Sequence, residues 1–359
     1  MAQHETESNL STATLENQAV SAPTGTGWRP RMPLPDGPLD ILGDIHGELD
    51  ALRAIMSHLG YAENGDHPAG RRMVFVGDLV DRGPDSPGVI RLVSNLVDRG
   101  VAQAVMGNHD LNAISQNQKK ENTWFFGHGP VHSFERTPSS AEEREQIIQF
   151  IGRLPLALER AGLRVVHAAW DDEALNALES AGDLLTALTE HRARVEQELG
   201  DESDPVERSL AHQNRNPVKL LTSGPEVRTA QAIHAGGKMC FQARHAWWDA
   251  YDDEPLVVFG HYSRLWDKRF HKGDQLFDGY PLNSTLGRGF SGGRSRGRGR
   301  GRGRAICVDY SVGGRIVDRK AGNLNGPFVG RLGALRWPER ELVFDDGERM
   351  PVIEPEVVS

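Results

Sequence analysis

The chain has 359 residues, with 41 lysines and arginines against 50 aspartates and glutamates, and therefore a formal net charge of −9. This acidic balance argues against a general nucleic-acid or membrane-surface binder, and no apolar run approaches the length of a membrane span. Only Cys240 and Cys307 are present, so the sequence supports neither a disulfide framework nor a thiolate metal site.

The N-terminal segment shows no pattern of a folded element. Residues 1–36 are rich in Thr, Ser, Pro and Gly, and they lack the basic start and the apolar stretch of a signal peptide. We therefore expect a disordered leader over residues 1–36 and a cytoplasmic protein. The motifs described below favour one large domain over residues 37–345, followed by a C-terminal tail over residues 346–359.

Three short strings recur at near-even spacing: residues 43–47 (GDIHG), 77–83 (GDLVDRG) and 107–110 (GNHD). Asp44, Asp78 and Asn108 stand second in these strings, 34 and 30 residues apart, and each string follows a short apolar run. The segments between the strings have the apolar spacing of amphipathic helices. This layout predicts repeated strand, loop and helix units whose loops carry carboxylate, imidazole or carboxamide ligands to one edge of a parallel sheet.

The two helices between the strings have recognisable ends. Apolar residues at helical spacing define the first one: Leu49, Leu52, Ile55, Met56 and Leu59. Gly60 is typical of the position just after a helix. The second helix is expected to begin after an Asp85 cap with proline in its first turn, and to end at Gly100.

Two later apolar strands each end in a histidine, at residues 163–167 and 256–261. Between them, residues 171–213 are acidic and helix-prone, which predicts a helical insertion. Both a substrate-selecting cap and a solvated helical decoration agree with this composition.

Arginine alternates with glycine almost strictly over residues 292–304. Such a tract cannot bury a core, so we expect a flexible Arg-Gly loop over residues 287–304. Its arginines favour phosphate-rich partners, so nucleic acid is a candidate partner for residues 294–304. The alternative is a tolerated low-complexity expansion in a surface loop.

The three strings resemble those of the calcineurin-like metallophosphoesterases, specifically the PPP-type phosphatases of the bacterial branch. The resemblance extends over roughly residues 38–345, because residues 309–315 and 332–336 look like the closing segment of that branch. It implies an α/β fold, an α+β four-layer sandwich in which two mixed β-sheets are flanked by helices, with a helical insertion. The family includes protein phosphatases and symmetrical diadenosine tetraphosphate hydrolases.

The resemblance also implies a binuclear metal centre. Asp44 and His46 would hold the first ion, Asp78 would bridge, and the second ion would be held by Asn108, His167 and His261. Oxygen and nitrogen donors without thiolate suit Mn²⁺, which is our first choice, with Fe or Zn²⁺ as alternatives. By the same resemblance, three more residues are catalytic.

His109 would protonate the leaving oxygen, with Asp81 orienting its ring, and Arg82 would clamp the phosphate. A second phosphate-binding arginine is expected between the two later histidines, and Arg215 and Arg244 are both candidates. One departure from the family concerns His167, which is followed by Ala168-Ala169-Trp170 where many relatives have a glycine. Trp170 would offer either a stacking surface for a base or a wall that narrows the mouth.

These residues predict a binuclear metal-dependent phosphatase that hydrolyses phosphate monoesters by metal-bound hydroxide, most simply a serine/threonine-type protein phosphatase. The substrate would be a phosphoprotein or a nucleotide, and no membrane partner is expected. The main alternative is a symmetrical bis(5'-nucleosyl)-tetraphosphatase. Further alternatives are a polynucleotide-end phosphatase and a nucleic-acid interaction protein that uses the Arg-Gly tract.

Overall fold

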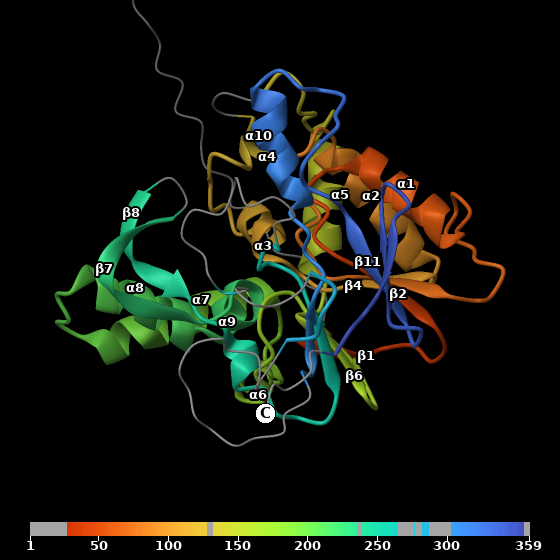
Figure 1. Ribbon diagram of the computed structural model, residues 1–359. Coiled ribbons are helices and arrows are strands. Elements are labelled where there is room, and N and C mark those ends of the chain that lie inside the picture. Colours follow the sequence, from red (N-terminus) through yellow and green to blue (C-terminus); the bar gives the residue numbers. More distant parts are fainter. Residues whose placement is uncertain are drawn as a thin grey trace, which may run out of the picture.

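Two mixed sheets pack face to face at the centre of the molecule, and helices lie against their outer faces (Figure 1). The computed structural model describes residues 27–127, 132–235, 238–264, 276, 282–286 and 303–354. The strand order of the six-stranded sheet is β13 (Arg349–Pro351), β12 (Glu341–Phe344), β11 (Gly333–Trp337), β2 (Leu39–Leu42), β3 (Arg72–Phe75) and β4 (Ala102–Ala104). The order of the five-stranded sheet is β1 (Arg31–Pro33), β5 (Ala157–Arg160), β6 (Leu163–Val166), β9 (Leu256–Phe259) and β10 (Ala305–Cys307).

Strand direction divides each sheet into parallel and antiparallel parts. β2, β3 and β4 are parallel to one another, whereas β11, β12 and β13 pair antiparallel. In the other sheet β6, β9 and β10 are parallel, and β5 runs antiparallel to β6. The carboxyl ends of the parallel strands therefore meet at a shared edge, which is where an α/β fold places its ligands.

The core has two parts, one on each side of a sheet. Along β3 and the residue after it, Val74 and Val76 pack between the two sheets, whereas Met73 and Phe75 pack against the helices. This alternation is the period-2 pattern of a strand that is buried on both faces. The layers are thus helix, sheet, sheet and helix, and the predicted four-layer class is confirmed.

The helices are α1 (Leu49–Leu59), α2 (Ser86–Asp98), α3 (Asn108–Ile114), α4 (Thr123–Phe126), α5 (Ala141–Gly152), α6 (Asp172–Leu178), α7 (Leu184–Leu199), α8 (Pro205–Arg215), α9 (Pro217–Ser223) and α10 (Arg315–Lys320), with 3-10 turns η1 (Trp247–Asp249) and η3 (Val312–Gly314). α1 ends at Gly60, whose φ of 97° is left-handed, and the Asp85 carboxylate caps α2 by accepting from the Gly88 N–H at 2.9 Å. Both predicted ends are confirmed. In the described part of the chain, no helix combines the length and the apolar character that crossing a membrane requires.

The predicted helical insertion is larger than the sequence indicates. It contains α6 to α9 and then the two-stranded hairpin of β7 (Glu226–Ala235) and β8 (Lys238–Arg244), which extends away from the sheets on the left of Figure 1. The hairpin is fastened to α8 by Asn214, whose side chain donates to the Glu226 carbonyl at 2.8 Å.

Both predicted terminal segments contain strands, so the folded part of the chain is longer than expected. β1 lies within the predicted leader and pairs with β5, and the Trp28 indole N–H nearby donates to the Leu154 carbonyl at 3.0 Å. β13 lies within the predicted tail and pairs with β12. The remainder of the leader, residues 1–26, and the Arg-Gly loop, apart from Gly303 and Arg304, lie outside the described residues.

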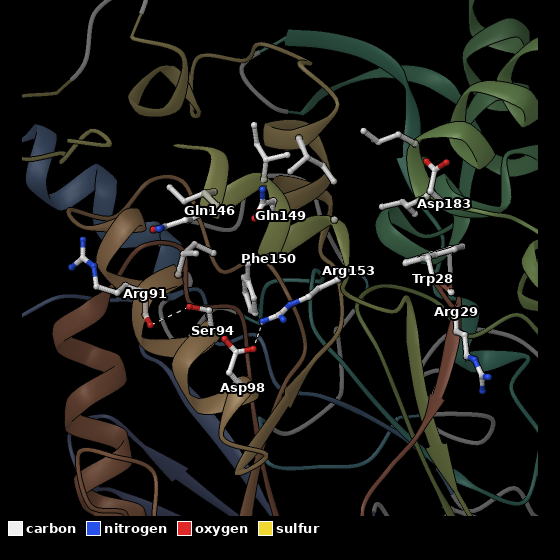
Figure 2. Close-up of a pocket in the computed structure, with 18 of the residues that line it drawn as sticks. Trp28, Arg29, Arg91, Ser94, Asp98, Gln146, Gln149, Phe150, Arg153 and Asp183 are labelled. Carbon is white, nitrogen blue, oxygen red and sulfur yellow. Dashed lines mark hydrogen bonds and ion pairs between the residues drawn. The ribbon is translucent and has the colours of Figure 1, made fainter. Parts of the chain in front are cut away.

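A cavity of about 870 Å³ lies between α2, α5 and the segment around Trp28 (Figure 2). Four of its charged side chains form two ion pairs, Arg153 with Asp98 and Arg91 with Glu143, both at 2.5 Å. None of the predicted ligands or catalytic residues lines it. The predicted chemistry therefore belongs to a different part of the molecule.

Candidate metal centre

The predicted metal ligands follow the carboxyl ends of strands from both sheets. They come after β2 (Asp44, His46), β3 (Asp78), β4 (Asn108), β6 (His167) and β9 (His261). Five of them are buried, and Asn108 is half-buried. The fold thus brings together all six residues, although they are spread over more than 200 positions of the sequence.

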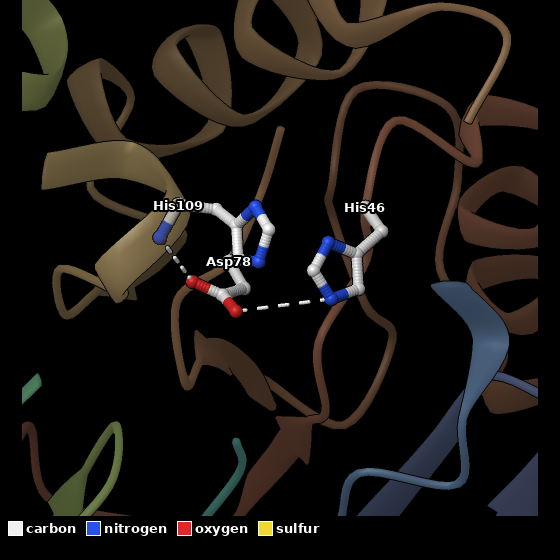
Figure 3. Close-up of side chains that lie close together, drawn as sticks. All are labelled: His46, Asp78 and His109. Atoms are coloured by element: carbon white, nitrogen blue, oxygen red, sulfur yellow. Dashed lines mark hydrogen bonds and ion pairs between the residues drawn. The ribbon is translucent and has the colours of Figure 1, made fainter. Parts of the chain in front are cut away.

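Asp78 lies at the centre of this group. His46 Nε2 is 3.7 Å from Asp78 Oδ2 and 3.9 Å from Asp44 Oδ2, while His167 Nε2 is 3.4 Å from Asp78 Oδ1. Figure 3 shows how His46 and His109 flank the Asp78 carboxylate. Two sets of possible ligand atoms, in each of which the atoms lie within 4.8 Å of one another, share Asp78. One set contains His46 and His109, and the other contains His167 and His261.

The hydrogen bonds of two histidines fix their tautomers. His46 Nδ1 is 3.1 Å from the Val80 carbonyl oxygen, and His167 Nδ1 is 2.8 Å from the Val76 carbonyl oxygen. Because a carbonyl only accepts, both Nδ1 atoms carry a hydrogen and both neutral rings keep a lone pair on Nε2. This is the form in which histidine binds a metal.

The donor atoms around His167 fit a cation. In the neutral ring, His167 Nε2 faces Asp78 Oδ1 at 3.4 Å and Asn108 Oδ1 at 3.3 Å, so three acceptors converge with no hydrogen between them. Such an arrangement is repulsive unless a positive charge lies among the three atoms. The residues present therefore fit a divalent metal ion.

The pKa shifts of the same residues show that the cluster favours a positive charge. Burial alone would lower the pKa of His167, but the carboxylates of Asp78 and Asp44 raise it to about 9. Burial alone would raise the pKa of Asp78, but the neighbouring imidazoles, His167 first, hold it well below its ordinary value. For Asp44, burial and then the charge of Asp309 raise the pKa well above the ordinary value. A bound proton thus supplies the positive charge that a metal cation would supply in this cluster.

The backbone of the centre is strained. His46, Asp78 and His261 have positive φ values of 48°, 48° and 61°, and so do Asp81 and Arg82, with 74° and 69°. Left-handed backbone costs a side-chain-bearing residue about 1 to 3 kcal/mol, and such residues cluster at functional sites. Two glycines permit the close packing of the carboxylates. A Cβ on Gly107 would lie 2.1 Å from Asp78 Oδ1, and one on Gly260 would lie 2.0 Å from Asp44 Oδ1.

His109, Asp81 and Arg82 lie together beside Asp78. His109 Nδ1 is 2.6 Å from Asp81 Oδ2, and Arg82 contacts His109 Nε2 at 3.0 Å and His46 Nε2 at 3.2 Å. Burial alone would lower the pKa of His109, but the charges of Asp78 and Asp81 raise it above its ordinary value. The imidazole and the guanidinium therefore lie side by side, where the first can hold a proton and the second can bind phosphate oxygens.

The structure separates the two candidates for a second arginine. Arg244, at the end of β8, donates to the His261 carbonyl at 2.9 Å, and its charge, after burial, lowers the pKa of His261. Arg215 lies at the end of α8, with its side chain about half exposed, and pairs with Glu198 at 3.7 Å. Only Arg244 is therefore adjacent to the metal-ligand group.

Sequence reasoning missed two residues of the loop and helix after α3. The Glu121 carboxylate lies 3.6 Å from Arg82 Nε and 3.9 Å from His109 Nε2, and the Trp124 indole contacts Asp81. Neither belongs to a recognisable string. Trp170, which the sequence analysis did single out, is buried. The Arg164 guanidinium lies 4.4 Å from its ring centre, so a stacking surface for a base would already be occupied on that side.

Comparison with known proteins finds one matching family model and several similar proteins. Residues 37–285 match the family model of the calcineurin-like phosphoesterases. The chain is 30% identical over 215 residues to a symmetrical bis(5'-nucleosyl)-tetraphosphatase of Janthinobacterium, covering 54% of this chain and 73% of that protein. It is 53% identical over 73 residues to an asymmetrical bis(5'-nucleosyl)-tetraphosphatase of Halalkalibacterium halodurans, covering 20% of this chain and only 30% of that relative. A cold-active protein-tyrosine phosphatase of a Shewanella species has 14% identity and a TM-score of 0.45, over 90% of this chain and 83% of that one.

Proposed function

Because this chain belongs to the calcineurin-like phosphoesterase family, we propose that it hydrolyses the phosphoanhydride chain of dinucleoside tetraphosphates. The strongest support is the match that covers 73% of a symmetrical bis(5'-nucleosyl)-tetraphosphatase. The reaction class, hydrolysis of phosphate esters, follows from the family itself. The second candidate substrate is a serine/threonine phosphoprotein, which is favoured by residues 77–83 (GDLVDRG), a string typical of PPP-type phosphatases.

The family uses a binuclear divalent metal centre, and the converging acceptors around Asp78 support its presence here. In our assignment Asp44 and His46 hold one ion and Asn108, His167 and His261 the other, with Asp78 shared. When bound, two divalent ions would lower the pKa of water and offset the charge of the phosphoryl oxygens. The donor set contains no thiolate, which favours Mn²⁺, with Fe or Zn²⁺ as alternatives.

The residues beside the metal ligands supply the proton and orient the phosphate. We assign the leaving-group proton to His109 Nε2, since Asp81 holds the other ring nitrogen at 2.6 Å. Arg82 is placed to bind phosphoryl oxygens, because its guanidinium lies between His46 and His109. Arg244 is the second phosphate-binding residue in this proposal, in preference to Arg215.

Two lysines are candidate contacts for a substrate with several phosphates. α9 lies against the segment after His167, since the Ala168 N–H donates to the Leu221 carbonyl at 3.1 Å. Lys219 of this helix has a pKa lowered by burial and then by the charges of Lys119 and Arg192. Lys119 and Glu121 belong to the same loop, and Glu121 lies near Arg82. Lys219 and Lys119 are our candidate contacts for the further phosphates of a tetraphosphate chain, which a monoester would not need.

Product analysis tests the proposal. The Mn²⁺-reconstituted protein is offered diadenosine tetraphosphate, a phosphopeptide and p-nitrophenyl phosphate at equal concentrations, with Asp78→Asn as the inactive control. Two ADP per dinucleotide, at a higher kcat/KM than for the esters, is the expected result. ATP plus AMP would indicate asymmetrical cleavage, and preference for the phosphopeptide would favour the protein-phosphatase alternative.

Deletion of residues 294–304 tests the nucleic-acid hypothesis separately. Lost RNA or DNA binding at unchanged turnover would assign nucleic-acid binding to the Arg-Gly tract.

A further inference from the structure

A tryptophan outside the three strings contacts the predicted catalytic pair. Trp124, on the short helix α4, is 1% exposed, and its indole N–H donates to Asp81 Oδ1 at 2.6 Å. The other carboxylate oxygen, Asp81 Oδ2, is 2.6 Å from His109 Nδ1. The carboxylate therefore bridges an indole and an imidazole, with one oxygen for each ring.

This contact restricts how the Asp81 carboxylate can rotate. An indole N–H can only donate a hydrogen bond. A hydroxyl or an amide in its place could also accept one, so the indole leaves a single arrangement in which the carboxylate is the acceptor. The indole itself is held in the core, where its ring packs edge-on against Phe125 with ring centres 5.4 Å apart. The backbone of Asp81 is fixed as well, since its N–H donates to Ser86 Oγ at 2.9 Å.

Burial alone does not account for the bond. The indole nitrogens of Trp170 and Trp247 are also buried, and neither has a hydrogen-bond partner among the described residues. The fold thus tolerates buried indoles without an acceptor. At Trp124 the acceptor is the carboxylate that lies 2.6 Å from His109 Nδ1.

We propose that Trp124 is a positioning residue for the reaction. Its indole N–H holds the Asp81 carboxylate in the orientation that aligns the His109 ring with the leaving oxygen. The inference rests on the proton-donor role proposed for His109, but it adds a residue that the strings of the sequence do not contain. Loss of a hydrogen bond to a charged group, such as the one from Trp124 to Asp81, is expected to lower turnover about 10- to 100-fold.

Leaving-group dependence tests this role. In the metal-loaded enzyme, Trp124→Phe keeps an aromatic ring but removes the donor. It should lower kcat about 10- to 100-fold on alkyl phosphates, whose leaving groups need a proton, and about threefold or less on p-nitrophenyl phosphate. KM should stay within about twofold. Trp247→Phe is the matched control, because it removes a buried indole without an acceptor and should spare both substrates.

A double-mutant cycle separates positioning from general damage. In a His109→Asn background, Trp124→Phe should cause no further loss on alkyl esters, because the group that it positions is gone. A full additional loss there, or equal losses on alkyl and aryl esters, would overturn the proposal. If His109→Asn itself shows no leaving-group dependence, the proposed proton donor is wrong, and that result is distinct from a failure of Trp124.

A spectroscopic measurement tests the contact without catalysis. In metal-free, ¹⁵N-labelled full-length protein, the Trp124 indole resonance is identified by its absence in Trp124→Phe. A strong hydrogen bond to a carboxylate predicts a downfield proton that moves upfield in Asp81→Ala, while the Trp247 resonance stays in place. An unchanged Trp124 resonance in Asp81→Ala would refute the bond whatever the enzyme hydrolyses.

Discussion

Adding one methyl group at Gly107 should displace the carboxylate of Asp78, which we propose is shared by the two metal ions. The backbone of Gly107, with φ −92° and ψ 171°, is extended and open to any residue, so alanine carries no conformational penalty there. Its Cβ, however, would lie 2.1 Å from Asp78 Oδ1 and 2.2 Å from Asp78 N. The effect of Gly107→Ala is therefore steric and is directed at Asp78.

The geometry sets the size of this effect. Because Cβ atoms essentially never approach another heavy atom closer than 3.0 Å, the carboxylate or the loop must move by about 0.9 Å. A misplacement of about 1 Å at a reacting centre lowers turnover by about 10²-fold. Loss of the bridging position should also weaken metal binding by about 10- to 100-fold. Calorimetric titration with Mn²⁺ and kcat/KM on p-nitrophenyl phosphate measure the two effects separately.

Gly182→Ala is the matched control, since a Cβ at Gly182 meets no atom within 4 Å. That variant should bind two ions and turn over as the parent does. Thermal unfolding of metal-free Gly107→Ala distinguishes a displaced ligand from a misfolded chain. Two ions bound at parental affinity with parental turnover in Gly107→Ala would refute the bridging role of Asp78 and the reasoning from close packing.

Four further variants have defined outcomes. Asp78→Asn should lower the metal content from two ions to one or none by elemental analysis, with activity reduced about 10³-fold or more. Arg244→Lys should raise KM about tenfold while Arg215→Lys leaves it unchanged, because only Arg244 lies at the centre. Burial lowers the pKa of Lys219 below its ordinary 10.5, so the unfolded chain binds that proton more tightly and parental stability rises with pH. Lys219→Met should thus be more stable than the parent at pH 7 in urea unfolding, by a margin that shrinks toward pH 10.5; a pH-independent margin would contradict this.

The loops that carry the candidate ligands, and their meeting at one edge, could be predicted from the sequence because the pattern of each loop is local. Asp44, Asp78 and Asn108 each follow a short apolar run, and parallel strands must bring such loops to one edge of a sheet. His167 and His261 end strands of the second sheet, and the resemblance of the strings supplied their partners. The ends of α1 and α2 were predictable for the same reason, since a cap and a terminal glycine act on adjacent residues.

The parts that the sequence did not predict depend on contacts between distant segments. β1 and β13 are three residues long and lie at the edges of their sheets, so their formation depends on β5 and β12 rather than on their own pattern. The choice between Arg215 and Arg244 depends on how the β7–β8 hairpin returns to His261. Trp124 acts through a bond to a residue 43 positions earlier, which no local spacing indicates.

The strain and the charges of the centre point to the same conclusion about its construction. Five residues of the site hold left-handed backbone, and the carboxylates of Asp44 and Asp78 are buried near each other and near Asp309. Each feature is unfavourable by itself, and together they persist because every one of these loops begins at a buried strand of one of the two sheets. A cation would relieve the repulsion without requiring the loops to move. The unfavourable free energy of organising the site is therefore met when the chain folds. Little reorganisation is then needed when a phosphate binds.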